Sequence, residues 1–333
     1  MAARGARLGV VSGCAMALVL LTGCAALTPN PTRRYAHPRP AITEVRLDSA
    51  TVEHGHHVQP VRLRAADGTV VDLLVKRPAP PVGSGGAGAD SMGGRRRPLV
   101  LILGGHQAGR EAARLIPDTH GHAVVALSYP YHGQDRRLSP LALLRRAPSM
   151  RRAAFATPTA IQLALDWLLV QPWVDTARVE GVGASLGVPF MTVTAAHDPR
   201  ITRLWLVHGA GQHYRLLSHN TRPLIRSKPV RAVAKQAVFT YMAGRHFSPD
   251  VWVGRVAPRP VIMINALEDE RLPRESILAL YEAAREPKQL IWLPGKHVQR
   301  NRPDVVRGLV TTILTTIERT PLPAAAITDG ARE

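Results

Sequence analysis

The sequence predicts an α/β protein built on a doubly wound, mostly parallel sheet. From residue 99 onward, short apolar runs typical of buried strands alternate with segments of helical periodicity. Strand-like segments before residue 78 predict antiparallel strands at the N-terminal side of this sheet. Of the 333 residues, 45% are hydrophobic and 20% are charged, which excludes a disordered, collagen-like or coiled-coil chain.

Residues 1–23 predict a secretory signal peptide. Basic residues precede an apolar run, Leu8–Leu21, that is shorter than the about 20 residues of a comfortable membrane span. Leu21-Thr22-Gly23-Cys24 resembles a bacterial lipobox, which implies cleavage before Cys24 and lipidation of its thiol. The proline-rich residues 24–40 predict a tether, so the chain is expected to be exported and lipid-anchored in the bacterial cell envelope. An ordinary signal peptide with an accidental cysteine is the alternative.

Residues 41–320 are expected to form one domain that begins with antiparallel strands. Ile42–Asp48 alternates with a strand period, and Ala65-Ala66-Asp67-Gly68 predicts a hairpin turn. The strands that this turn joins are expected at Val58–Arg64 and Thr69–Lys76. Residues 78–98 are rich in proline, glycine and arginine and predict a flexible surface loop inside the domain, because the strands before it are too few to bury a core.

Alternating strands and helices follow. Apolar runs predict strands at Leu99–Leu103, Val124–Leu127, Val179–Val182, Ile201–Val207, Val261–Ile264 and Leu290–Leu293. Spaced apolar residues predict helices at Ala160–Leu169, Leu186–Ala196, Pro273–Arg285 and Pro303–Glu318. The alternation breaks at residues 209–259, a basic stretch that we expect to form a mostly helical cap over the carboxyl edge of the sheet. Residues 321–333 are expected to be a C-terminal tail.

Cysteine content and charge narrow the functional classes. Both cysteines, Cys14 and Cys24, lie in the first 24 residues, so the rest of the chain offers no disulfide scaffold, thiolate nucleophile or cysteine-ligated zinc. The formal net charge of +19 favours contact with anionic surfaces, although arginines spread over a solvated face explain it more simply. No run interleaves basic and aromatic residues, and therefore no nucleic-acid partner is expected.

Gly183-Ala184-Ser185-Leu186-Gly187 joins an expected strand to the helix expected from Leu186. A serine on such a tight turn needs small neighbours, because its strained backbone packs against adjacent chain, and the two glycines meet that need. The helix N-terminus behind the serine supplies a positive dipole for a developing oxyanion. Ser185 is therefore the candidate nucleophile. A glycine-rich turn with a capping serine is the structural alternative.

A serine nucleophile needs a base, and the base needs an orienting acid. The loops after the last two expected strands carry Asp269 and His297, in the order that this strand–turn–helix nucleophile usually has. No other histidine follows Asp269 in the sequence, which makes His297 the candidate base. Glu268 and Glu270 flank Asp269 and are rival acids, and three adjacent carboxylates could also form a solvated loop.

With these motifs in place, residues 98–318 resemble the α/β-hydrolase superfamily, especially bacterial esterases similar to dienelactone hydrolases and acetyl esterases. Asp166–Leu169 and Arg178–Gly187 are similar to the helix and the turn that precede and carry their nucleophile. Ala257–Val261 and Asp269–Pro273 resemble the segment that carries their acid. The resemblance implies the α/β-hydrolase fold and a serine–histidine–aspartate triad, but no particular substrate.

The chain departs from the family pattern in three places. The usual His-Gly of the oxyanion turn is Leu103-Gly104-Gly105-His106, the glycine before the histidine base is Lys296, and the glycine after the acid-bearing strand is Asn265-Ala266. An oxyanion hole uses backbone N–H groups, so the first departure need not remove it. The candidate donors are the backbone N–H groups of His106 and Leu186.

Other histidines receive no catalytic role. His54-Gly55-His56-His57 lies between expected strands without a spaced fourth ligand, which favours a polar turn over a zinc site. Tyr131-His132-Gly133 resembles a common structural loop of the family. His208 and His213 follow the strand expected at Ile201–Val207 and could face the pocket, but the sequence assigns them no role.

Together these observations predict a serine hydrolase of carboxylic esters, acting on a small-molecule, glycan or lipid ester. Ser185 would attack the carbonyl, His297 would carry its proton to the alcohol, Asp269 would stabilise the imidazolium, and water would release the acyl group. No metal or organic cofactor is implied. A peptidase-like or lactone hydrolase on the same triad is one alternative. A non-catalytic envelope lipoprotein, whose basic cap binds an anionic polymer, is another.

Overall fold

The computed structural model describes residues 34–35, 39–79, 96–131, 133, 140–221, 227–299 and 301–320. The expected signal peptide, Cys24 and the C-terminal tail lie outside these residues, as do most of the expected tether and of the loop at 78–98. Statements on those segments therefore stay predictions.

One mixed sheet of ten strands organises the described residues. Its order is β1-β3-β4-β6-β5-β7-β8-β9-β10, and β2 pairs with β3. The antiparallel part contains β1 (Ile42–Leu47), β2 (Thr51–Glu53), β3 (His56–Ala65) and β4 (Val70–Pro78). The parallel part contains β5 (Arg97–Leu103), β6 (Ala123–Leu127), β7 (Val174–Ala184), β8 (Arg203–Val207), β9 (Val261–Ala266) and β10 (Lys288–Leu293). The predicted fold class is confirmed.

Buried strands explain why the parallel part could be found from apolar runs. Every residue of β6, β8 and β9 is buried, because helices cover both faces of this part of the sheet. The predicted hairpin is also present, with β3 and β4 paired from Arg64 opposite Val70 outward. Gly68 makes its turn possible, since its φ of 82° lies in the left-handed region that side chains disfavour.

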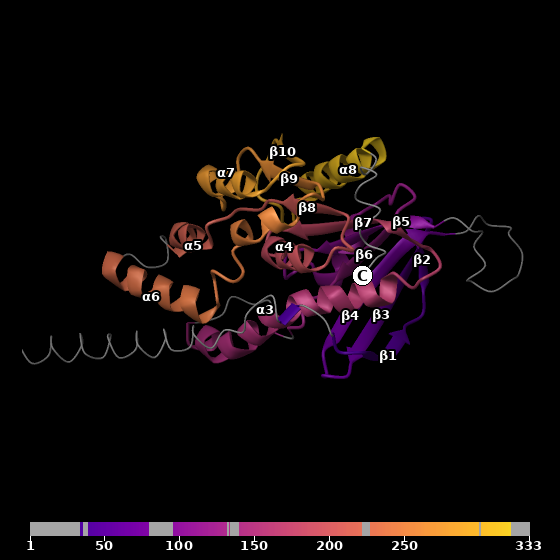
Figure 1. The fold of residues 1–333 in the computed structure, drawn as a ribbon, viewed down its shortest axis with the longest axis horizontal. Helices are drawn as coiled ribbons and strands as arrows, with labels where there is room; N and C mark the ends of the chain where they lie inside the picture. The colour runs from indigo at the N-terminus through magenta and orange to yellow at the C-terminus, as the bar shows by residue number, and fades with distance from the viewer. Residues whose placement is uncertain are drawn as a thin grey trace, which may run out of the picture.

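Helices form a layer on each face of the sheet (Figure 1). On one face α3 (Pro140–Leu168), α4 (Gly187–His197) and α7 (Arg274–Ala283) contribute to the larger hydrophobic core. On the other face the 3-10 helix η1 (Gly109–Leu115) and α8 (Pro303–Arg319) pack on a smaller core. The sheet is therefore wound on both sides, as the alternation predicts.

Helix α3 begins twenty residues earlier than the sequence suggests. Its first half contains Pro148, and Pro158 lies just before the stretch whose helical period is clear. Proline removes a backbone donor and ordinarily ends a helix, so sequence reasoning places the start too late. The short strand β2 was not expected either, because three residues cannot display an alternating pattern.

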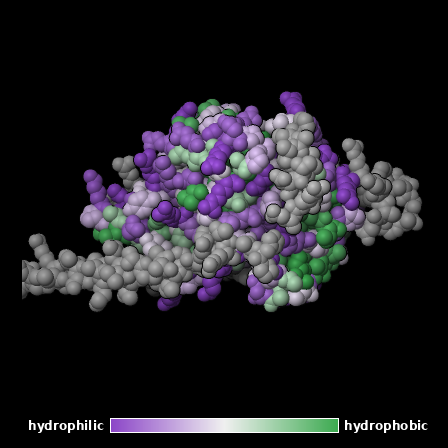
Figure 2. Space-filling view, viewed as in Figure 1, coloured by the Kyte–Doolittle hydropathy of each residue, from purple (hydrophilic) through white to green (hydrophobic). Residues whose placement is uncertain are grey.

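The interrupted stretch from residue 209 to 259 contains α5 (His213–Thr221), α6 (Lys228–Tyr241) and two 3-10 helices, η2 (Pro249–Val251) and η3 (Val253–Arg255). Figure 1 shows α5 and α6 projecting from one end of the molecule, beyond α4. None of the residues of α6 is buried, and Figure 2 shows hydrophobic surface at this projecting end. Among the described residues, no helix combines the length and hydropathy needed to cross a membrane.

Candidate active site

Ser185 lies on a sharp turn between β7 and α4. Its φ is 53°, a left-handed value that is unusual for a residue with a side chain. At the two neighbouring glycines, Gly183 and Gly187, the surrounding backbone leaves no room for a side chain. A Cβ on Gly183 would lie 2.9 Å from the carbonyl oxygen of Gly187, and a Cβ on Gly187 would lie 1.8 Å from that of Leu103. Close packing on both sides therefore holds the strained turn that presents the serine hydroxyl.

The structure brings the three predicted residues together at the carboxyl edge of the sheet. Ser185 Oγ lies 2.7 Å from Nε2 of His297, and Nδ1 of His297 lies 2.8 Å from Oδ2 of Asp269. Asp269 follows β9 and His297 follows β10, which are adjacent parallel strands, so their loops emerge side by side. The side chains of His297 and Asp269 are each only 2% exposed, which keeps water from competing for the bond between them.

Asp269 is held as an anion. Its Oδ1 accepts the backbone N–H groups of Arg271 at 2.9 Å and Leu272 at 3.0 Å. Burial raises the pKa of this carboxyl, but hydrogen bonding to His297 and to the backbone outweighs burial and holds the pKa well below its usual value. An ionised carboxylate beside Nδ1 keeps the proton of the imidazole on that nitrogen and leaves Nε2 free to accept one from serine.

The two rival acids contact the backbone of the His297 loop, not the imidazole. Glu268 accepts the N–H of Gly295 at 2.8 Å, and Glu270 accepts the N–H of His297 at 3.0 Å. Burial raises the pKa of Glu270, but the N–H of His297 and the Arg302 guanidinium together outweigh burial and lower the pKa to about 2. Both glutamates therefore position the loop, while the Asp269 carboxylate is the one bonded to the His297 ring.

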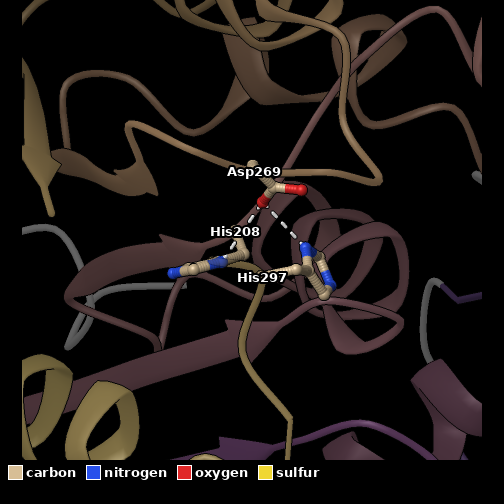
Figure 3. Close-up of side chains that lie close together, drawn as sticks. All are labelled: His208, Asp269 and His297. Atoms are coloured by element: carbon tan, nitrogen blue, oxygen red, sulfur yellow. Dashed lines mark hydrogen bonds and ion pairs between the residues drawn. The ribbon is translucent and has the colours of Figure 1, made fainter. Parts of the chain in front are cut away.

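His208 is a fourth polar residue at this site, and sequence reasoning gave it no role. It directly follows β8, and its Nδ1 lies 3.3 Å from the same Asp269 oxygen that contacts His297 (Figure 3). The His208 and His297 rings meet edge to face, with centroids 5.2 Å apart. Nδ1 of His208 also accepts the N–H of Val298 at 3.0 Å, which requires that this nitrogen carry no proton. Burial lowers the pKa of His208 and so favours that neutral form.

These three side chains also form the one group of possible metal ligands found in the described part of the chain. Their ligand atoms all lie within 4.8 Å of one another. The Nδ1 lone pair of His208 is already engaged by the Val298 amide, which leaves no lone pair there for an ion. The arrangement therefore fits a carboxylate flanked by two imidazoles better than a metal centre.

The candidate oxyanion donors line one cavity together with the serine. His106 and Leu186 both border a cavity of about 920 Å³ that also contacts Ser185. The Tyr129 hydroxyl donates to the carbonyl of Gly104 at 2.7 Å and braces the glycine turn before His106. Leu186 precedes α4, so its N–H lies at the positive end of that helix. The assignment of these two N–H groups as oxyanion donors stays a prediction.

Other histidines lie away from this centre. His54 and Gly55 form the turn between β2 and β3, and Nδ1 of His56, the first residue of β3, contacts the His54 carbonyl oxygen at 2.9 Å. His213 begins α5, where its N–H donates to the hydroxyl of Ser248. His132 lies outside the described residues.

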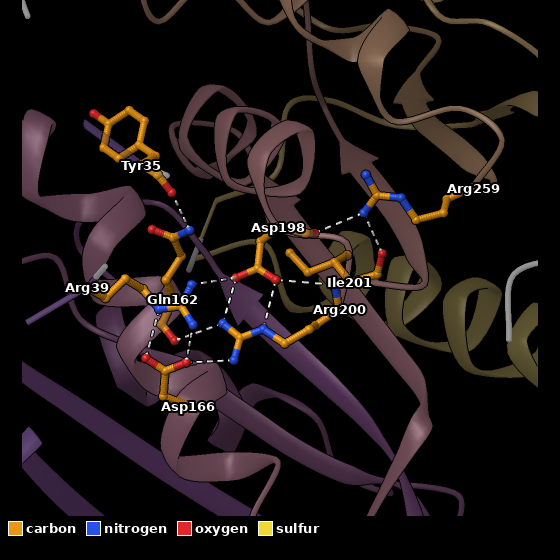
Figure 4. Close-up of polar contacts among 8 residues, drawn as sticks. All are labelled: Tyr35, Arg39, Gln162, Asp166, Asp198, Arg200, Ile201 and Arg259. Atoms are coloured by element: carbon orange, nitrogen blue, oxygen red, sulfur yellow. Dashed lines mark hydrogen bonds and ion pairs between the residues drawn. The ribbon is translucent and has the colours of Figure 1, made fainter. Parts of the chain in front are cut away.

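A polar network ties α4 and the start of β8 to the rest of the domain (Figure 4). Asp166 of α3 binds Arg39 at 2.8 Å and Arg200 at 2.6 Å, and Arg200 also binds Asp198 at 2.6 Å. Because Arg200 and Asp198 lie between α4 and β8, this network supports the two elements whose ends carry Ser185 and His208.

Arg259 extends this support through backbone carbonyls at the end of α4. Its guanidinium donates to Ala195 at 2.6 Å, Asp198 at 3.0 Å and Ile201 at 2.8 Å. Arg259→Met should lower the free energy of unfolding by about 3 kcal/mol, because it leaves these acceptors unpaired. Urea unfolding would measure the loss. The exposed Arg307, changed to Met, should stay within about 0.5 kcal/mol of wild type. Equal losses in both variants would contradict the capping role.

Comparison with known proteins supplies structural neighbours only. No protein-family model matches the chain, and no curated protein matches its sequence. Acetyl xylan esterases from Thermoanaerobacterium sp. and Paenibacillus sp. are each 15% identical, with TM-scores of 0.53 and 0.55. The alignments cover 83% of this chain and 89% of the first, and 88% of this chain and 93% of the second. A puromycin-hydrolyzing peptidase from Mycobacterium tuberculosis is 16% identical with a TM-score of 0.58, over 81% of this chain and 40% of that one.

Proposed function

We propose that this protein, which has an α/β-hydrolase fold, hydrolyses carboxylic esters with Ser185 as the nucleophile. The observation that carries the proposal is the continuous contact from the Ser185 hydroxyl through His297 to the ionised Asp269. A serine hydroxyl is a poor nucleophile unless a base accepts its proton, and this arrangement supplies one. The names of the two acetyl xylan esterases give the ester class independent support.

In the proposed reaction, Ser185 Oγ bonds to the ester carbonyl carbon while its proton moves to Nε2 of His297. The N–H groups of Leu186 and His106 would stabilise the oxyanion, a contribution worth about 3 kcal/mol for one donor in such sites. The carbon–oxygen bond to the alcohol then breaks, and the imidazolium gives its proton to the departing alcohol. Water, deprotonated by His297, releases the acyl group by the reverse sequence, and Asp269 stabilises the imidazolium in both halves.

A fluorophosphonate probe tests the activated serine without knowledge of the substrate. The wild-type domain should be labelled, Ser185→Ala should not be, and His297→Ala should be labelled at least about 100-fold more slowly because the proton acceptor is lost. Circular dichroism would establish that each variant is folded. An unlabelled but folded wild type would overturn the proposal. It would favour the non-catalytic alternative, in which the basic helices α5 and α6 bind an anionic polymer.

We further propose that the chain is exported and anchored to the cell envelope through a lipid on Cys24. The sequence Leu21-Thr22-Gly23-Cys24 supports this proposal. Metabolic labelling with a fatty-acid analogue should mark the full-length protein and Cys14→Ser, but not Cys24→Ser. Cys14→Ser is the matched control because it lies in the apolar part of the leader. Label retained in Cys24→Ser would contradict the lipid anchor. A high-salt wash distinguishes a lipid anchor from membrane binding by basic residues, because salt weakens only the binding by basic residues.

A further inference from the structure

The cavity at Ser185 extends far beyond the catalytic atoms, along the sheet face that η1 and α8 cover. On the sheet its wall is formed by Val100 and Ile102 of β5, Val182 of β7 and Val207 of β8. Val100 is paired with Glu180, five residues before Ser185 along β7. Val100 is only 1% exposed and closes the far end of the cavity, so at about 3.3 Å per strand residue the open space ends within roughly 16 Å of the nucleophile.

The opposite walls come from the two helices of that face. Ala112 and Leu115 of η1 border one side, and Leu309, Ile313 and Leu314 of α8 border another. All of these side chains are apolar. The 3-10 helix η1 is only seven residues long, and α8 covers the sheet beside it. Among the described residues, none of the lining side chains comes from residues 209–259.

Polar groups gather at the mouth of the cavity. His106, Gln107 and Ser185 border it together with Arg271, Gln299 and Asn301 from the loops after β9 and β10. The cavity is thus polar where an ester carbonyl or a carboxylate product would lie, and apolar below. A ligand that fits it has one polar head and a long hydrocarbon tail.

We propose that the substrate is an ester of a long, unbranched fatty acid, whose acyl chain lies in this cavity between the sheet, η1 and α8. The inference rests on the proposed ester hydrolysis, in which the acyl group becomes bonded to Ser185 Oγ as the alcohol leaves. The alcohol departs on the His297 side, where it receives its proton.

Size and polarity favour a long acyl chain over a short one. The cavity volume of about 920 Å³ lies near the upper end of the range of about 300–1,000 Å³ found for small-molecule pockets. An acetyl group would occupy only its mouth. An apolar cavity is poorly filled by water, because water finds no hydrogen-bond partners there, so a hydrocarbon chain that enters it gains the burial of its own surface.

Chain-length dependence of hydrolysis is the direct test. With p-nitrophenyl acetate, butyrate, octanoate and dodecanoate, kcat/KM should rise by up to about fourfold for each methylene that enters the cavity. The octanoate should exceed the acetate by about 100-fold or more. A preference for acetate over octanoate would overturn the inference while leaving the proposed ester hydrolysis intact.

Bulky substitutions on α8 test where the acyl chain of the substrate lies. Ile313→Trp, which narrows the deep part of the cavity, should lower the ratio of dodecanoate to butyrate turnover by at least about tenfold. Thr311→Trp adds the same side chain to an exposed position of the same helix and should leave the ratio as in wild type. If Ile313→Trp fails to fold, Ala112→Leu narrows the cavity from the η1 side. An unchanged ratio in a folded variant would contradict this location.

Binding without turnover separates failure of the inference from failure of the proposed function. Ser185→Ala should bind parinaric acid, a fatty acid that fluoresces in apolar surroundings, and dodecanoate should displace it whereas acetate should not. Adding Ile313→Trp should abolish the binding, and adding Thr311→Trp should not. Binding in this pattern with no ester turned over by the wild type would refute the ester hydrolase and keep the fatty-acid site. Absence of binding would refute the site.

Discussion

Replacement of Asp269 by asparagine is expected to lower kcat/KM for ester hydrolysis by about 10³- to 10⁴-fold with the fold intact. The reason is a change of tautomer. The carboxylate now contacts Nδ1 of His297 at 2.8 Å and keeps the proton there. An amide can turn its NH₂ group toward the imidazole, which then carries its proton on Nε2. In that form His297 cannot accept the proton of Ser185, and the imidazolium loses its anionic partner.

Glu268→Gln and Glu270→Gln are the matched controls for this prediction. Each glutamine keeps a carbonyl oxygen that can accept the N–H of Gly295 or His297, so each variant should retain activity within about tenfold of wild type. The measurement is kcat/KM on a p-nitrophenyl ester, together with thermal melting as a check on folding. A 10³-fold loss in Glu270→Gln, with Asp269→Asn near wild type, would transfer the role of orienting acid to Glu270.

The choice among these three carboxylates shows where sequence reasoning stops. Chain order places an acid on the loop after β9, but residues 268 to 270 are adjacent, and spacing alone cannot tell which one faces His297. Backbone hydrogen bonds decide it in the structure. The N–H groups of Arg271 and Leu272 bind Oδ1 of Asp269 and leave Oδ2 for the imidazole.

The parallel part of the sheet was predictable for a physical reason. Strands buried on both faces are mostly apolar, so β6, β8 and β9 stand out as short apolar runs. Since parallel strands end at the same edge, the loops that carry Ser185, Asp269 and His297 were expected to meet. Features that depend on three-dimensional packing were not predictable. The direction of the His208 side chain and the cavity beside Ser185 are features of this kind.

Gly187, at the start of α4, packs directly against the backbone of β5. Gly187→Ala should lower the free energy of unfolding by about 3 kcal/mol and the rate of Ser185 labelling by at least about 100-fold. A Cβ at this position would lie 1.8 Å from the carbonyl oxygen of Leu103, which is backbone and cannot rotate away. To relieve the clash, α4 must move away from β5.

That movement links stability to the site, because α4 and β5 carry the two halves of the expected oxyanion hole. Leu186 precedes α4, whereas the turn that leads to His106 begins where β5 ends at Leu103. Separating the two elements displaces Ser185 from His297 and widens the hole, and a shift of about 1 Å is enough to cost about 100-fold in rate.

Gly308→Ala provides the contrast needed to interpret Gly187→Ala. Gly308 lies within α8, and nothing would lie within 4 Å of a Cβ there. Alanine should therefore raise the free energy of unfolding by about 0.5–1 kcal/mol through helix propensity alone. Urea unfolding and the rate of fluorophosphonate labelling check both variants. If Gly187→Ala matched wild type in both measurements, the packing of α4 against β5 could not be what positions Ser185, and the strain at its φ of 53° would have to be held by other contacts.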